Sequence, residues 1–144
     1  MTAFGSYNGE ATLPRADAVP MKHVASMPAS GWIMTDNGPV PVLRANIDLA
    51  GFTGSADLIA AVSGKTLALV SAVIAGGGNS LAYFLDGAGT SIFGGTNGKI
   101  QLSTTPFVLP VNNHFWMRGG VSQAIRINLA SSVSLGGVVQ YVQL

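Results

Sequence analysis

The sequence of 144 residues lacks cysteine and has little charge. Without cysteine, the chain can form neither disulfide bonds nor thiolate metal sites. Charged residues make up 9% of the chain, against about 25% in ordinary globular domains. The seven basic and six acidic side chains are scattered singly, so we expect no nucleic-acid partner. A surface with so few charges protects a monomer poorly against association. We therefore expect much of this surface to be covered by other chains.

Long apolar runs are also missing, although apolar residues make up 48% of the sequence. The longest run extends over residues 66–75. It is far shorter than the ~18 residues that cross a bilayer, so we expect no membrane partner. The start of the chain shows no basic segment followed by an apolar one, so we also expect no secretory signal.

Motifs for catalysis, cofactors and metals are incomplete or missing. Ser63–Thr66 matches the end of a phosphate-binding loop, but that motif requires glycine where this chain has Ile59. The Gly-Ala-Gly sequence at residues 87–89 lacks the third glycine of a dinucleotide loop. His23 and His114 have no carboxylate or second histidine at ligand spacing, and the acidic residues are solitary. We therefore expect no cofactor, no metal ion and no enzyme activity.

Residues 66–75 are the stretch around which the rest of the chain is expected to pack. They contain no charge, proline or glycine, and turn-forming residues flank them: Ser63–Lys65 before and Gly76–Gly78 after. A strand with apolar side chains on both sides is covered on both faces. The pattern therefore predicts a central, buried strand.

The remaining strand signals are shorter and more amphipathic, and they begin after residue 44. Asp86-Gly87 follows an apolar run, which is typical of a hairpin. A strand at residues 114–118 would place Phe115 and Trp116 on opposite faces, one of them outward, where an aromatic residue often marks an interface. The other predicted strands extend over residues 45–49, 57–62, 80–85, 90–93, 99–102, 107–109, 124–129 and 138–142. These eight or nine short strands, without an amphipathic helix, predict an all-β fold, an antiparallel jelly-roll-like β-sandwich over residues 44–144.

Residues 1–43 differ from the rest of the chain. They hold five of the seven prolines and show no sustained periodicity, yet large apolar side chains punctuate them, unlike ordinary disordered segments. Ordering ~40 residues costs on the order of 40–80 kcal/mol in backbone entropy, which a segment without its own core cannot offset. We therefore predict an extended N-terminal arm that docks on a partner; the alternative is a flexible tail. The predicted contact residues are Phe4, Tyr7, Leu13, Met21, Met27, Trp32 and Ile33.

Five segments of the chain follow a pattern known from another group of proteins: residues 57–75, Asp86–Thr90, Leu109–Phe115, Ile127–Ala130 and Gly136–Val142. In these segments the chain resembles small structural proteins of tailed bacteriophages. The similarity covers about residues 57–143 and does not include the arm. The resemblance implies a β-sandwich virion protein of the capsid decoration (cement) type on the outer surface of the phage head, often clustered as trimers.

The composition, the predicted fold and the resemblance leave three functions to consider. The first is a non-enzymatic capsid decoration protein that stabilises the capsid lattice. In that protein the arm docks on the major capsid protein, and the sandwich associates with itself as a homotrimer, with Trp116 and Tyr83 at the contact or its rim. The alternative is a tail or fibre-associated module in which Tyr83 or Trp116 stacks on a cell-surface glycan. A small hydrolase is the least favoured, because no catalytic group of residues can be assembled from the sequence.

Overall fold

The computed structural model describes residues 31–144, and these residues form strands, turns and loops without any helix. The first three strands are β1 (Trp32–Thr35), β2 (Gly38–Pro41) and β3 (Leu43–Ile59). The middle of the chain forms β4 (Thr66–Gly76), β5 (Ser80–Asp86), β6 (Ser91–Phe93) and β7 (Ile100–Leu102). The last strands are β8 (Phe107–Leu109), β9 (Met117–Val121) and β10 (Ile125–Gln143). Every pairing between them is antiparallel, which confirms the predicted all-β class.

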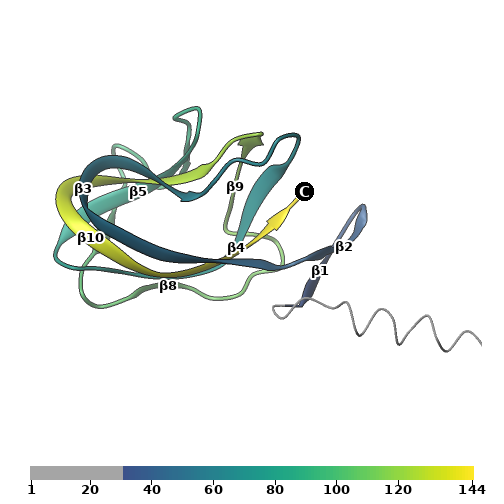
Figure 1. Cartoon of the computed structure of the whole chain (residues 1–144), viewed down its shortest axis with the longest axis horizontal. Coiled ribbons are helices and arrows are strands. Elements are labelled where there is room, and N and C mark those ends of the chain that lie inside the picture. The colour runs from purple at the N-terminus through teal and green to yellow at the C-terminus, as the bar shows by residue number, and fades with distance from the viewer. Residues whose placement is uncertain (1–30) are drawn as a thin grey trace, which may run out of the picture.

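Strand β10 is the centre of the main sheet. One of its edges pairs with β3 along most of its length, while the other edge pairs first with β5 and then with β4. Its register shifts between Leu129 and Leu135, where small residues predominate. Such irregularities bend a strand. In Figure 1 the ribbons of β3 and β10 turn together at the left of the view, so that both strands contribute to two facing layers.

The main hydrophobic core lies between these layers. Most of its fully buried members come from β4, β5 and β10, including Leu67, Leu69, Phe84 and Ile127, and β7 adds Leu102. Strand β4 also buries Ala68 on its other face. The sequence prediction of a central strand covered on both sides is therefore confirmed for the first half of β4.

Short strands extend the sheet beyond β4 and β5. Strand β5 pairs with β6 and β7, and β4 pairs with β8 and β9. The predicted turn at Asp86-Gly87 joins β5 to β6, where Phe84 and Phe93 lie opposite each other and their rings pack edge to face at 5.9 Å. The result is a nearly closed, sandwich-like antiparallel sheet, whereas the jelly-roll arrangement stays a prediction.

Two long strands replace four of the short ones that the sequence predicts. Strand β3 joins the predicted strands at residues 45–49 and 57–62, and β10 joins those at 124–129 and 138–142. The glycines between them do not end the strands, because pairing with β10 continues at Phe52 and Gly54.

The strand predicted at residues 114–118 is wrong for residues 114–116. These three residues lie in a turn built on Asn112, whose side-chain oxygen accepts a hydrogen bond from His114 N at 2.9 Å. Its carbonyl accepts another from Phe115 N at 3.1 Å. The strand β9 begins only at Met117. Phe115 and Trp116 therefore do not alternate across a strand.

Candidate functional site

The last part of the predicted arm is a separate two-stranded hairpin. Strands β1 and β2 pair with each other, and within residues 31–144 they belong to no other sheet. Their turn, Asp36-Asn37, is followed by Gly38, whose φ of +101° favours glycine. Thr35 Oγ1 donates to Gly38 O at 2.7 Å and accepts from Asn37 N at 3.2 Å. The arm was predicted to continue to residue 43, but residues 32–41 fold locally because this turn closes a hairpin.

The inner face of the hairpin is anchored on the body by a second hydrophobic cluster. Ile33 is only 5% exposed and packs in this cluster with buried side chains from β4 and β10. The cluster consists of Ile33, Val42, Ala68, Val70 and Val142, with Val40, Phe115 and Leu144 packed against it. Ile33 was predicted to contact a partner protein; instead it points inward and fastens the hairpin to its own chain.

Phe115 completes this anchor in an unfavourable backbone conformation. Its φ is +64°, which is rare for a bulky side chain and costs on the order of 1–3 kcal/mol. The surrounding backbone holds it there, since Asn112 N donates to Val70 O at 3.0 Å and Trp116 N donates to Leu69 O at 2.9 Å. The turn thus carries the Phe115 ring to the hairpin cluster.

The outer face of the hairpin is apolar and open to solvent. Trp32 is 43% exposed and lies opposite Pro41, while Met34 is 74% exposed and lies opposite Pro39. Residues directly opposite in a pair share one face of a hairpin, so these four side chains form one surface. We call Trp32, Met34, Pro39 and Pro41 the hairpin patch. Tryptophan and methionine are enriched at protein interfaces, and tryptophan is a frequent hot spot of binding energy.

The prolines of the hairpin patch also determine how a partner can approach it. The N–H of Val42 donates to Gly31 O at 2.9 Å, so the even-numbered residues of β2 direct their N–H groups toward β1. By alternation, Pro39 and Pro41 stand where N–H groups would point away from β1, and proline has none. A strand added at this edge would lack donors. The hairpin patch is therefore suited to contact through side chains.

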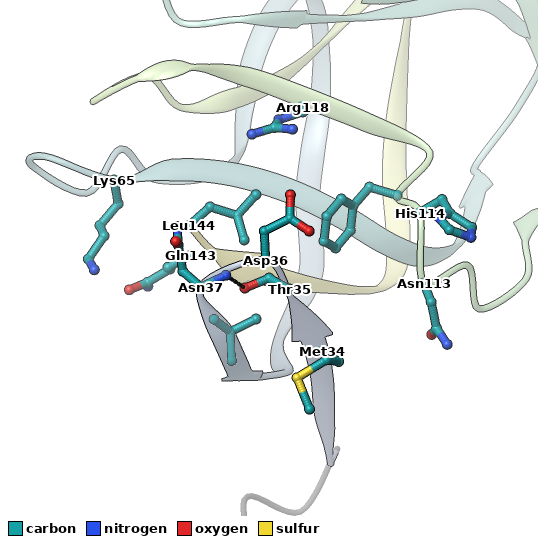
Figure 2. Close-up of a pocket in the computed structure, with 12 residues that line it drawn as sticks. Met34, Thr35, Asp36, Asn37, Lys65, Asn113, His114, Arg118, Gln143 and Leu144 are labelled. Atoms are coloured by element: carbon teal, nitrogen blue, oxygen red, sulfur yellow. Dashed lines mark hydrogen bonds between the residues drawn. The ribbon is translucent and has the colours of Figure 1, made fainter.

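An open groove of about 800 Å³ separates the turn of the hairpin from the body. Figure 2 shows its lining: Asp36 enters from the hairpin turn, Arg118 from β9, and Lys65 and His114 from either side. Among the lining side chains, Lys65 and Arg118 are permanent cations and Asp36 is an acid. Small-molecule sites usually enclose most of the ligand surface, so an open groove of this kind fits a segment of a partner chain better.

A row of valines extends the apolar surface on the outer side of the sheet. Val73 of β4 lies opposite Val108 of β8 on one side and Val138 of β10 on the other. Val108 is 55% exposed and Val73 is 41% exposed. The hairpin covers Ala68 on this same face of β4, so the row and the hairpin lie on one side of the molecule.

The other predicted contact residues lie elsewhere. Trp116 is half-buried against the main core, and its indole N–H donates to Pro110 O at 2.6 Å, so it packs within the fold. Tyr83 is half-buried on β5, opposite Asn128 of β10. The structure does not join these two residues into one surface with the hairpin patch. The arm residues Phe4, Tyr7, Leu13, Met21 and Met27 lie outside the described residues.

Asp86 and Asp57 make contacts within the fold. Asp86 is buried, and its carboxylate accepts hydrogen bonds from Ala88 N at 3.0 Å, Thr90 N at 2.9 Å and Gly120 N at 3.3 Å. It therefore ties the β5–β6 turn to β9. Asp57 lies 2.8 Å from Arg126 Nε across the β3–β10 pair. Within residues 31–144, no group of three or more histidine, aspartate or glutamate side chains could hold a metal ion.

Sequence reasoning missed Met34, Pro39 and Pro41 as members of one surface. The signal was present, because Asn37-Gly38 lies between two segments rich in apolar residues, which indicates a hairpin. No helix in residues 31–144 has the length and apolarity to cross a membrane. In comparisons with known proteins, no family model, no curated protein and no solved structure matched the chain.

Proposed function

We propose that this chain is a non-enzymatic structural protein of a phage virion that binds and stabilises the capsid lattice. The hairpin patch is its docking element on the major capsid protein, and the preceding 30 residues extend the contact. The body serves as a compact support on the outer surface of the head. One observation carries the proposal: a separate hairpin, anchored by its inner face, exposes Trp32 and Met34 on its outer face.

The exposed position of Trp32 and Met34 supports this proposal. Exposing tryptophan and methionine together leaves apolar area in water that a partner surface would cover, at roughly 25 cal/mol per Å². The body already has its own core, so these side chains are not needed to complete it. A protein that binds only the assembled shell makes disassembly of that shell less favourable. The resemblance to phage structural proteins supports a capsid as this partner.

Removal of the patch tests the proposal. The experiment mixes the full chain with capsids lacking it, prepared from the particle whose genome encodes the chain, and measures occupancy by co-sedimentation. We expect Trp32→Ala to lower occupancy at least tenfold, because interface tryptophans often contribute 2 kcal/mol or more, roughly a thirtyfold change. Leu81→Ala is the matched control, since Leu81 is similarly exposed but lies on β5. Equal binding of both variants, or no binding of the unchanged protein, would overturn the proposal.

A second candidate function is a tail or fibre-associated module that binds a glycan. Tyr83 favours it, because it lies directly opposite Asn128 in the sheet, and the side-chain amide of Asn128 donates to Ser55 Oγ at 3.0 Å. An aromatic face beside amide and hydroxyl groups offers both stacking and hydrogen bonding. A glycan array probed with the full chain and with Tyr83→Ala distinguishes the two functions. Binding that depends on Tyr83 supports this second candidate.

A further inference from the structure

Strand β3 has one paired edge and one open edge. It pairs with β10 from Leu43 to Ile59, and within the part of the chain that the structure describes no strand pairs with its other edge. In Figure 1 its ribbon follows that of β10 through the bend at the left of the view. An open strand edge presents backbone N–H and C=O groups that can pair with another chain.

The open edge of β3 lacks the protection that β2 has. Prolines 39 and 41 remove donors from the free edge of β2, whereas residues 43–59 contain no proline and no lysine. Exposed charges and register shifts also protect strand edges, and the shifts in β3 begin after Leu49. Residues 43–49 pair regularly with β10 and contain no proline, so this part of the open edge is suited to pairing with another strand.

The sequence of the first part of β3 is self-complementary. Leu43–Leu49 reads Leu-Arg-Ala-Asn-Ile-Asp-Leu. When two copies run antiparallel and Asn46 faces the second copy's Asn46, each Arg44 faces an Asp48. In the same register, each Leu43 faces a Leu49 and each Ala45 faces an Ile47. Opposite charges directly across an antiparallel pair are stabilising, and like charges are destabilising.

The burial pattern of β3 agrees with this register. Arg44, Asn46 and Asp48 are exposed on the outer face of the strand, so the charge pairs would lie in solvent. On the inner face Ile47 is buried, whereas Leu43 and Leu49 are only half-buried. Pairing of two copies would bring these half-buried leucines together and continue the apolar face from one body into the next.

We propose that two copies of this chain associate through the open edges of β3, antiparallel around Asn46, to form one continuous sheet with two-fold symmetry. An isologous contact of this kind closes at two copies. It therefore predicts a dimer in solution, whereas the resemblance to phage proteins implies a trimer. The proposal does not depend on what the hairpin patch binds.

A charge swap tests the register in the full chain by analytical ultracentrifugation. Arg44→Asp places two acids opposite each other at both ends of the contact, and Asp48→Arg does the same with two bases. We expect each single variant to weaken dimerisation about tenfold or more. The double variant R44D/D48R restores opposite charges across the pair, so we expect it to dimerise nearly as well as the unchanged protein. Lys99→Asp is the control, because Lys99 is exposed in the loop before β7.

A cysteine placed at the symmetry centre gives a second, independent readout. The chain has no cysteine of its own, so Asn46→Cys introduces a single thiol. Residues directly opposite in an antiparallel pair have Cβ atoms about 4.5–5.5 Å apart, near enough for a disulfide after a small adjustment. We expect oxidation to give a covalent dimer. Thr53→Cys is the matched control on the same strand, and the proposed register keeps its two copies far apart.

The possible results distinguish the proposed dimer from other states of the chain. Rescue by the double variant together with cross-linking at residue 46, and none at residue 53, supports the proposed pairing. A monomer or trimer whose mass does not respond to the charge changes overturns it. Equal cross-linking at both cysteines also overturns it, as does occupation of the β3 edge by residues 1–30 of the same chain. Circular dichroism of each variant verifies that the body stays folded.

Discussion

The β1–β2 hairpin and the body formed by β3–β10 use apolar side chains in different ways. In the body, the large apolar residues of β4, β5 and β10 gather in one core between two layers. In the hairpin, neighbouring residues point to opposite faces: Ile33 packs on the body, while Trp32 and Met34 are exposed on the outer face. The buried core and the exposed apolar hairpin patch thus lie in separate parts of the molecule. A change in the hairpin patch should therefore leave the core intact.

The body and the hairpin should also differ in how cooperatively they unfold. The body should unfold as a unit because β10 contacts three strands at once. Among the described strands, β1 and β2 pair only with each other, and a small cluster attaches them to the body. Segments with few buried contacts open locally at lower free energy than the whole domain. The four predictions below test this division, from the largest effect to the smallest.

Phe84→Ala should destabilise the body most. Phe84 is fully buried and packs against Phe93 and Phe107. Truncating a core phenylalanine usually lowers the free energy of unfolding by about 3–5 kcal/mol. Urea unfolding measures the loss. Leu81→Ala, on the exposed side of the same strand, should cost less than about 1 kcal/mol. Equal losses for both variants would contradict the described packing of β5.

Gly137→Ala should destabilise the body through its backbone. The φ of Gly137 is +147°, and a Cβ atom there would collide with the carbonyl oxygen of Val73 on the neighbouring strand. Strain and overpacking together suggest a loss of about 2–5 kcal/mol in the free energy of unfolding. Gly98→Ala is the control, because nothing lies near its added Cβ. Thermal unfolding should show a large decrease in Tm for the first variant only.

Ile33→Ala should loosen the hairpin and spare the body. Burial of Ile33 contributes about 2–4 kcal/mol to the anchor. Hydrogen exchange should become faster in residues 32–42, while the amides of β10 keep their protection. Trp32→Ala is the neighbouring control and should leave this exchange pattern nearly unchanged, since its side chain faces outward. Faster exchange throughout β10 would show that the hairpin and the body unfold together.

Asp57→Asn should have the smallest effect. Asp57 and Arg126 form an ion pair of 2.8 Å across β3 and β10, but the side chains are 54% and 32% exposed. Surface pairs of this kind contribute about 0–1 kcal/mol, and salt screens them. Urea unfolding at low and high salt checks this expectation. A loss of several kcal/mol would mean that the pair does more than join two strands at the surface.

Much of the body could be predicted from sequence because its signals are local. The run Thr66–Ala75 is apolar on both sides, and Asp86-Gly87 follows an apolar strand, so both features were predicted correctly. The continuity of β3 and β10 was missed. Glycines usually end a strand, but here a neighbouring strand continues the pairing through Gly54 and keeps the segment extended. The continuity of β3 is therefore determined by its pairing with β10 and cannot be seen in the local sequence of β3.

The candidate site was predicted in part. Trp32 was expected to contact a partner, and the structure places it on the exposed hairpin patch. Ile33 was assigned the same role but packs inward, because alternation along a strand directs neighbouring side chains to opposite faces. The prolines obscured this alternation, since Pro39 and Pro41 suggested an irregular arm. Trp116 was misplaced because the strand predicted around it is a turn.

The place of β10 in the sheet has a consequence for synthesis. This strand follows all the other described strands in the chain, yet β3, β4 and β5 are each hydrogen-bonded to it. During synthesis, the apolar residues of β4 therefore stay exposed until β10 has left the ribosome and can pair with them. An intermediate with exposed apolar strands is prone to aggregate. Expression at low temperature, or with chaperones that hold nascent chains, should raise the soluble yield.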